Sequence, residues 1–238
     1  MTSVVEQLLV SIGRPLVWAG RTTGALAGTA GHTLALILRG RIAWRSVIEQ
    51  AYLIGNGSLM FITVTLGFLG LISVFQTALQ IQQIVPDFTM LGAAFLSMLL
   101  REFAPTITGL MIATRVGSGI AAEVGSMTVT EQIDALRMCN ADPVEYLIVP
   151  RTLACAVMMV TLAVYGAAIA YLCGMICANV AFDVNYRTFL NLQLATVNDV
   201  IVGVLKAGAY GIAIPVIAGH AGLTATGGSE GVGWATTT

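Results

Sequence analysis

The sequence of 238 residues has little charge, since charged residues make up only 10% of it, against roughly 25% in an ordinary soluble domain. Aromatic residues are also few, at 7%, although hydrophobic residues reach 57%. The formal net charge of −1 leaves no basic excess that would attract a nucleic acid. These shortages exclude a soluble α/β enzyme, a disordered chain and a nucleic-acid-binding protein. They predict an integral membrane protein whose helices pack closely in lipid.

Residues that carry metal, redox or phosphate chemistry are also scarce. His32 and His220 are too few and too isolated for a zinc site. Cys139, Cys155, Cys173 and Cys177 form no CxxC pair and read as small apolar packing residues. The sequence has no phosphate-binding loop of the GxxxxGKS or GxxxxGKT type, and its single lysine lies in an apolar run. We therefore expect no metal, no cofactor and no ATP hydrolysis by this chain.

Four long apolar runs predict four membrane-spanning helices, because each exceeds the roughly 20 residues that a span requires. The runs cover residues 50–86, 88–114, 152–182 and 200–229. The first is long enough for one span plus a re-entrant or external piece. Arg101 and Glu102 interrupt the second run, and Pro215 predicts a kink in the fourth.

The residues before these runs predict a different kind of element. Residues 4–38 are apolar but interrupted by arginine and glycine, which favours an amphipathic helix in the membrane interface, with a fifth span as the alternative. The predicted fold is therefore all-α, with an N-terminal interfacial segment (1–49) and a membrane domain (50–238) of four to five transmembrane helices.

The distribution of arginine predicts the orientation in the membrane. Five arginines precede the first span: Arg14, Arg21, Arg39, Arg41 and Arg45. Arg137 and Arg151 lie between the second and third spans, whereas residues 80–87 after the first span contain none. Because cytoplasmic segments are rich in arginine and lysine, the N-terminus and residues 123–151 are expected in the cytoplasm.

Two predicted spans carry small residues at every fourth position. The stripes are Gly109, Ala113, Gly117 and Ala121, and Gly166, Ala170, Gly174 and Ala178. Such stripes let helix backbones approach closely, either within one subunit or across a dimer.

A short polar segment between the second and third spans predicts a cytoplasmic helix at about residues 128–140. Thr128 and Glu131 have the spacing of a capping box, which predicts a helix beginning at Val129. Asn140 fits a left-handed helix terminator, and Pro143 prevents the helix from continuing. On pattern alone this helix is either an interfacial connector or a docking element.

The stretch that contains this segment resembles the signature region of the MlaE/YrbE permease family. It reads LREFAPTITGLMIATRVGSGIAAEVGSMTVTEQIDALRMCNADPVEYLIVPR, and the tail GLTATGGSEGVGWATTT continues the likeness. Members of this family are the membrane subunits of ABC systems that move phospholipids or related lipids between bacterial membranes. The family continues past this tail into a last membrane helix, whereas the sequence stops at Thr238, so that helix is expected to be either absent or not included in the given sequence.

The resemblance implies a set of partners and a role for the short helix. It makes residues 131–136 a coupling helix that docks on a separate ABC ATPase subunit. The residues expected to take part are Glu131, Gln132, Asp134, Leu136 and Arg137. It also implies a second permease copy, identical or related, an MCE-domain periplasmic protein, a phospholipid substrate, and a location in the bacterial inner membrane.

Charged residues inside the predicted spans are candidates for substrate handling, because charge in the membrane is costly unless it is paired or hydrated. Arg101, Glu102 and Lys206 either form a structural ion pair or line a lipid cavity and meet the phosphate headgroup. The family motif favours the second role. Arg115 and Glu123, near the cytoplasmic end of the second span, are expected to anchor the coupling helix.

Two other classes of membrane protein compete with this interpretation. An ion-coupled secondary transporter or channel would require carboxylates at mid-membrane, where only Glu102 qualifies. An intramembrane serine protease would use Ser118 and His220, but Val116 stands where such a site would have glycine. ATP dependence of transport separates a permease subunit from the secondary transporter, and alkylation of Ser118 by a fluorophosphonate probe would support the protease.

Overall fold

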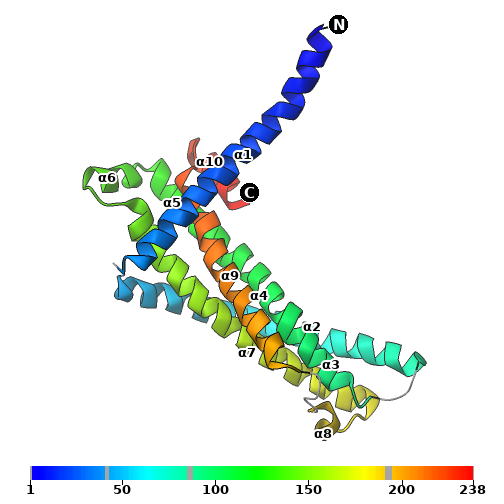
Figure 1. Cartoon of the computed structure of the whole chain (residues 1–238). Coiled ribbons are helices and arrows are strands. Elements are labelled where there is room, and N and C mark those ends of the chain that lie inside the picture. The colour runs from blue at the N-terminus through cyan, green and yellow to red at the C-terminus, as the bar shows by residue number, and fades with distance from the viewer. Residues whose placement is uncertain (1, 41–42, 85–87, 191–194, 238) are drawn as a thin grey trace. The chain divides into compact units, whose positions relative to one another are not determined.

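A computed structural model describes residues 2–40, 43–84, 88–190 and 195–237 of the chain. These residues form helices and no strand (Figure 1). Four helical segments in this part of the chain are long and apolar enough to cross a membrane, namely Trp44–Gln83, Leu91–Val129, Val144–Phe182 and Val197–Leu223. The expected all-α membrane fold is confirmed, and the chain is a multi-pass membrane protein.

The chain forms two compact units. One unit contains Ala43–Ile120 and Pro150–Pro215, and the other contains Met1–Ile42, Ala121–Val149 and Val216–Thr238. The predicted N-terminal helix is present as α1 (Thr2–Leu38) and is not one of the four candidate spans among the described residues. Arg41, which the orientation argument used, lies outside the described residues.

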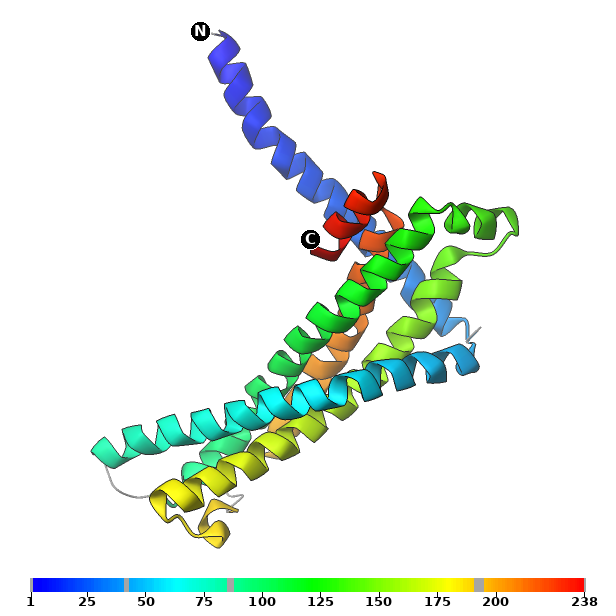
Figure 2. The same ribbon diagram turned by 180° about the vertical axis from the view of Figure 1, so that it is seen from behind.

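The first apolar run forms a single helix, α2 (Trp44–Ile84), of 41 residues. At 1.5 Å per residue it is about 60 Å long, twice the roughly 30 Å of a bilayer core. Of the two alternatives for the extra length, the re-entrant piece is therefore wrong, whereas an external extension of the same helix fits. At Gly70, well along α2, the backbone of α2 lies so close to that of Ala170 that only glycine fits. A Cβ at this position would be 2.1 Å from the carbonyl oxygen of Ala170. Figure 2 shows α2 beside α7 (Val149–Phe182), which contains Ala170.

The glycines of both small-residue stripes pack against another helix of the same chain. Those of α7 meet α2, and those of the second span meet α9 (Val197–Leu223). The pairs are Gly166–Leu66, Gly174–Val74, Gly109–Tyr210 and Gly117–Ile214. The structure therefore uses these glycines for packing within the subunit.

The second span is continuous helix rather than two pieces. It consists of α3 (Leu91–Met98), the π-helical η1 (Leu99–Phe103), α4 (Ala104–Ile112), the π-helical η2 (Ala113–Gly117) and α5 (Ser118–Val129). Pro105 has no N–H to donate to the carbonyl of Arg101, and its ring would clash there in a regular α-helix. The wider π turn just before Pro105 accommodates both problems. A third π turn, η3 (Val144–Ile148), precedes Pro150 in the same way.

The fourth span begins and ends at points that the apolar run did not predict. At its start, the carboxylate Oδ2 of Asp199 accepts a hydrogen bond from the backbone N–H of Thr196 at 3.0 Å, as in a capping box. The short α8 (Tyr186–Phe189) precedes it in the chain. The span ends at Leu223 instead of Ser229, because Gly227 and Gly228 take positive φ angles and a separate helix, α10 (Gly228–Thr237), begins.

The predicted capping box at Thr128 and Glu131 is wrong. The Thr128 hydroxyl donates to the carbonyl of Gly222 at 3.0 Å, near the end of α9, where carbonyls lack partners within the helix. Helix α5 therefore runs on to Val129, Glu131 takes a left-handed conformation (φ 60°), and α6 (Gln132–Met138) begins there. Asn140 is left-handed as predicted, with a φ of 57°.

Candidate substrate site and coupling helix

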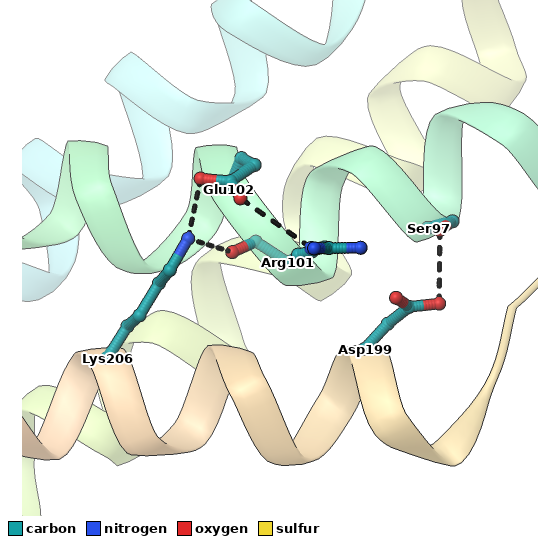
Figure 3. Close-up of polar contacts among 5 residues, drawn as sticks. All are labelled: Ser97, Arg101, Glu102, Asp199 and Lys206. Atoms are coloured by element: carbon teal, nitrogen blue, oxygen red, sulfur yellow. Dashed lines mark hydrogen bonds and ion pairs between the residues drawn. The ribbon is translucent and has the colours of Figure 1, made fainter.

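Arg101, Glu102 and Lys206 meet at one place in the structure (Figure 3). Lys206 Nζ lies 2.6 Å from Glu102 Oε2, and it also donates to the carbonyl oxygen of Arg101 at 3.2 Å. Arg101 Nε lies 3.7 Å from Glu102 Oε1. Two cations thus share the Glu102 carboxylate, and these three side chains alone carry one net positive charge, while the carboxylate of Asp199 also interacts electrostatically with Arg101. The contacts are those of an ion-paired cluster, and a role of these residues in binding a lipid headgroup stays a prediction.

The backbone at the cluster explains why Lys206 reaches it. Because Pro105 cannot donate a hydrogen bond to the Arg101 carbonyl, that oxygen is open to an outside donor, and the Lys206 ammonium supplies one. Gly203, one turn before Lys206, allows α9 to approach, since a Cβ there would lie 2.2 Å from the carbonyl oxygen of Leu100. Pro105 and Gly203 are therefore part of the site, although neither side chain is charged.

Asp199 extends the polar contacts along α9 toward its N-terminal end. Its carboxylate accepts a hydrogen bond from the Ser97 hydroxyl at 3.0 Å, so α3 and α9 are tied together about two turns from Lys206 (Figure 3). Asp199 is almost fully buried. Asp199 was not among the predicted site residues, although a threonine three residues before an aspartate at the start of an apolar run is a signal that points to it.

The three charged side chains lie at the surface, and not in the interior, of the unit formed by Ala43–Ile120 and Pro150–Pro215. Their side chains are 57% exposed for Arg101, 49% for Glu102 and 34% for Lys206. Beside them is a cavity of about 30 Å³ with almost wholly apolar walls, lined by residues that include Pro105, Ala163 and Gly203. A space of that size admits a water molecule but no acyl chain.

The residues expected to dock on an ATPase lie on α6 and just before it. Glu131, Gln132, Asp134 and Arg137 are exposed, and Leu136 is half-buried. Arg137 Nη1 pairs with Asp134 Oδ1 at 3.1 Å, one turn away on the same helix. Ile133 is the single buried residue of α6. The polar side chains of α6 are thus open to a partner.

Arg115 has a contact that the sequence analysis did not anticipate. Its Nη1 donates to the Ser58 hydroxyl of α2 at 3.3 Å, and its guanidinium lies against Gly57. Glu123 lies exposed on α5. The observed partner of Arg115 is thus α2, and the anchoring of the coupling helix by Arg115 and Glu123 stays a prediction.

The residues of the competing protease hypothesis are engaged elsewhere. The Ser118 hydroxyl donates to the carbonyl of Arg115 in its own helix at 3.3 Å. His220 Nδ1 forms a hydrogen bond with the Thr29 hydroxyl of α1 at 3.0 Å. The first contact lies within one helix, and the second joins α9 to α1. Across the described ranges, no group of three or more histidine, cysteine or acidic residues is arranged to hold a metal ion.

Comparisons with known proteins agree with the resemblance seen in the sequence. Residues 47–238 match the family model described as "Permease MlaE". The chain is 38% identical over 224 residues to a "Probable ABC transporter permease protein" of Synechocystis, with 93% of this chain and 84% of the relative covered. A protein of the same description from Rickettsia bellii is 33% identical over 229 residues, covering 95% and 88%.

A plant relative belongs to the same group. The chloroplastic protein TRIGALACTOSYLDIACYLGLYCEROL 1 of Arabidopsis thaliana is 31% identical over 227 residues, covering 93% of this chain and 63% of the plant protein. With most of the chain matched by the family model and by these relatives, the chain belongs to the MlaE family of ABC transporter permeases.

Proposed function

We propose that this chain is the membrane-spanning subunit of an ABC system that moves phospholipid or a related lipid between the bacterial inner membrane and an MCE-domain protein. A separate ATPase drives the movement. The observation that carries the proposal is the cluster of Arg101, Glu102 and Lys206 on two candidate membrane spans. In a family of transport subunits, an ammonium and a guanidinium group on such helices have the chemistry to bind a lipid phosphate.

The identity of the cargo rests on both chemistry and relationship. A lipid presents an anionic or zwitterionic headgroup beside long apolar chains, and the cluster presents a cationic group on an apolar helix surface. The name of the Arabidopsis relative is that of a galactolipid, which supports a lipid cargo in this family. Lys206 and Arg101 would bind the headgroup. Glu102 would hold both cations in position after one lipid has left and before the next one binds.

The exposed polar face of α6 supports docking on an ATPase. Its Asp134 and Arg137 side chains are more than 60% exposed and satisfy each other, which costs little in water and leaves both available to a partner. The chain lacks a phosphate-binding loop of its own, so the energy of ATP must come from another subunit. In this arrangement the N-terminus and α6 lie in the cytoplasm.

The exposure of the charged cluster supports a second permease copy. Half-exposed charges facing hydrocarbon would be costly, whereas two copies facing each other would enclose a hydrated cavity between their clusters. A two-fold pair also matches two ATPase subunits. An MCE-domain protein would then receive or deliver lipid at the outer end of this cavity.

Copurification and reconstitution test the proposal. The chain purified from its native membrane in mild detergent is expected to bring an ATPase subunit and an MCE-domain protein with it. In proteoliposomes the complex is expected to move labelled phospholipid only with ATP, and independently of proton or sodium gradients. Transport that needs an ion gradient and ignores ATP would instead support the alternative, an ion-coupled secondary transporter or channel.

A further inference from the structure

A second basic group lies on the same span as the charged cluster and has its own groove. Arg115 follows Arg101 by fourteen residues, which corresponds to roughly 20 Å of helix. It lies in the π-helical η2, a type of turn that often occurs at functional sites. The groove beside it has a volume of about 610 Å³ and is lined by Gly57, Met60, Phe61, Val64, Thr114 and Arg115.

The immediate surroundings of Arg115 leave its charge without an acidic partner among the described residues. The Ser58 hydroxyl, at 3.3 Å, accepts from one of the five guanidinium N–H groups. A Cβ at residue 57 would lie 2.6 Å from Arg115 Nη2, so the glycine makes the space that the guanidinium occupies. An arginine held this way inside a candidate span needs an anion or water to offset its cost.

The rest of the groove is apolar and open. Met60 is 79% exposed, Phe61 49% and Val64 62%, and all three follow Gly57 along the same stretch of α2. The groove thus offers one fixed cation beside a strip of apolar side chains. That pairing matches a molecule with a phosphate at one end and hydrocarbon at the other, and a free phosphate would leave the apolar strip unused.

We propose that the Arg115 groove is a second phospholipid site, in which the guanidinium binds the lipid phosphate while Met60, Phe61 and Val64 contact the acyl chains. This inference rests on the proposed lipid transport and adds a second binding site to the route of the lipid. Along the second span, Arg115 lies between Arg101 and the C-terminal end of the span, which α6 follows in the chain. A lipid would therefore meet two cations in sequence on its way through the membrane.

A crosslinking experiment can locate the lipid directly. The purified complex, with a photoreactive amino acid in place of Phe61, is placed in nanodiscs that contain equal amounts of phosphatidylglycerol and monogalactosyldiacylglycerol, which has no phosphate. Mass spectrometry then gives the ratio of the two lipid adducts. Since a charge-assisted hydrogen bond contributes enough for about a tenfold preference, adducts with phosphatidylglycerol should dominate by about that factor.

Matched positions and variants make the result specific. The same photoreactive residue at Ile72, exposed on nearly the same face of α2 about three turns away, should show no preference. Arg115→Gln should remove the preference at position 61, and Arg115→Lys, which keeps the charge, should retain part of it. Gly57→Ala displaces the guanidinium and should lower the preference even in a well-folded protein.

Several outcomes would overturn the second site. These are equal adduct yields at position 61 in the unsubstituted complex, adducts to a second permease chain in place of lipid, or loss of the preference on adding inorganic phosphate. The ATP-driven transport assay reports separately on the proposed function. Normal transport without any preference at position 61 refutes only this site, whereas a clear preference in a complex that moves no lipid supports the site and refutes the proposed function.

Discussion

The ion pair between Glu102 and Lys206 allows a structural role to be separated from a role in headgroup binding. Glu102→Gln removes the carboxylate that two cations share and leaves Arg101 and Lys206 facing each other with two net positive charges. Lys206→Met leaves the Arg101–Glu102 pair, whose atoms are 3.7 Å apart, with no net charge. The double variant returns to one net positive charge. The carboxylate substitution should therefore be the more destabilising of the two.

The expected size follows from distance and exposure. A pair of charges in contact near a protein surface interacts by about 4 kcal/mol at an effective dielectric constant of about 20. Exposure of 49% for Glu102 and 34% for Lys206 screens part of this, so we expect Glu102→Gln to cost about 2 kcal/mol and Lys206→Met about 1 kcal/mol. For a chain of this length the first corresponds to a fall in Tm of roughly 4–8 °C. The double variant should lie within about 1 kcal/mol of the parent protein.

Two measurements on the same three variants distinguish the roles. Thermal unfolding in detergent gives stability, and ATP-driven transport of phospholipid in proteoliposomes gives function. If Lys206 binds the headgroup, the double variant regains stability but transports at least about tenfold more slowly, because a cation for the phosphate is gone. Parental transport in the double variant would refute headgroup binding by Lys206. Unchanged stability in both single variants would refute the ion pair itself.

Three further predictions concern coupling, packing and orientation. Asp134→Lys on the exposed face of α6 should abolish ATP-driven transport without unfolding the chain. As a control, the same change at the exposed Asp183, in the turn after α7, should leave transport intact. ATPase and transport rates equal to those of the parent protein in the Asp134 variant would contradict α6 as the docking element. Gly203→Val should destabilise the chain by several kcal/mol in a detergent melt, because a Cβ there would overlap a backbone carbonyl of the second span, and an unchanged Tm would contradict that close approach. Native Cys139, which is exposed, should resist an impermeant thiol reagent in intact spheroplasts while a cysteine at Gln82 reacts, and the opposite labelling would reverse the proposed orientation.

Much of this protein is encoded locally. The four spans were predictable because an uninterrupted apolar run has one stable form in a bilayer, a helix that satisfies every backbone group internally. The family was recognisable from the stretch between Leu100 and Arg151. The charges at Arg101, Glu102 and Lys206 were visible as candidates because charge within an apolar run is rare whatever its partner. These features depend on composition and spacing along one segment.

Helix ends were harder to predict, because the same local signal has different outcomes in different surroundings. A threonine followed three residues later by an acidic residue occurs at Thr128 and again at Thr196. Thr196 does cap a helix through Asp199, whereas the Thr128 hydroxyl is taken by the carbonyl of Gly222. That carbonyl comes from residues far along the chain, and no local pattern reveals it.

An all-α membrane permease with charges in its spans could be predicted from the residues in order along the chain. The contacts of Lys206 with Glu102 and the Arg101 carbonyl, the position of Arg115 against Gly57 beside an open groove, and the unbroken course of α2 became visible in the folded chain. The physical reason is that a helix follows from the residues of one segment, whereas an ion pair or a glycine contact requires two segments to approach. In these helices that approach is set by packing between backbones distant in sequence, where a single Cβ would be too large.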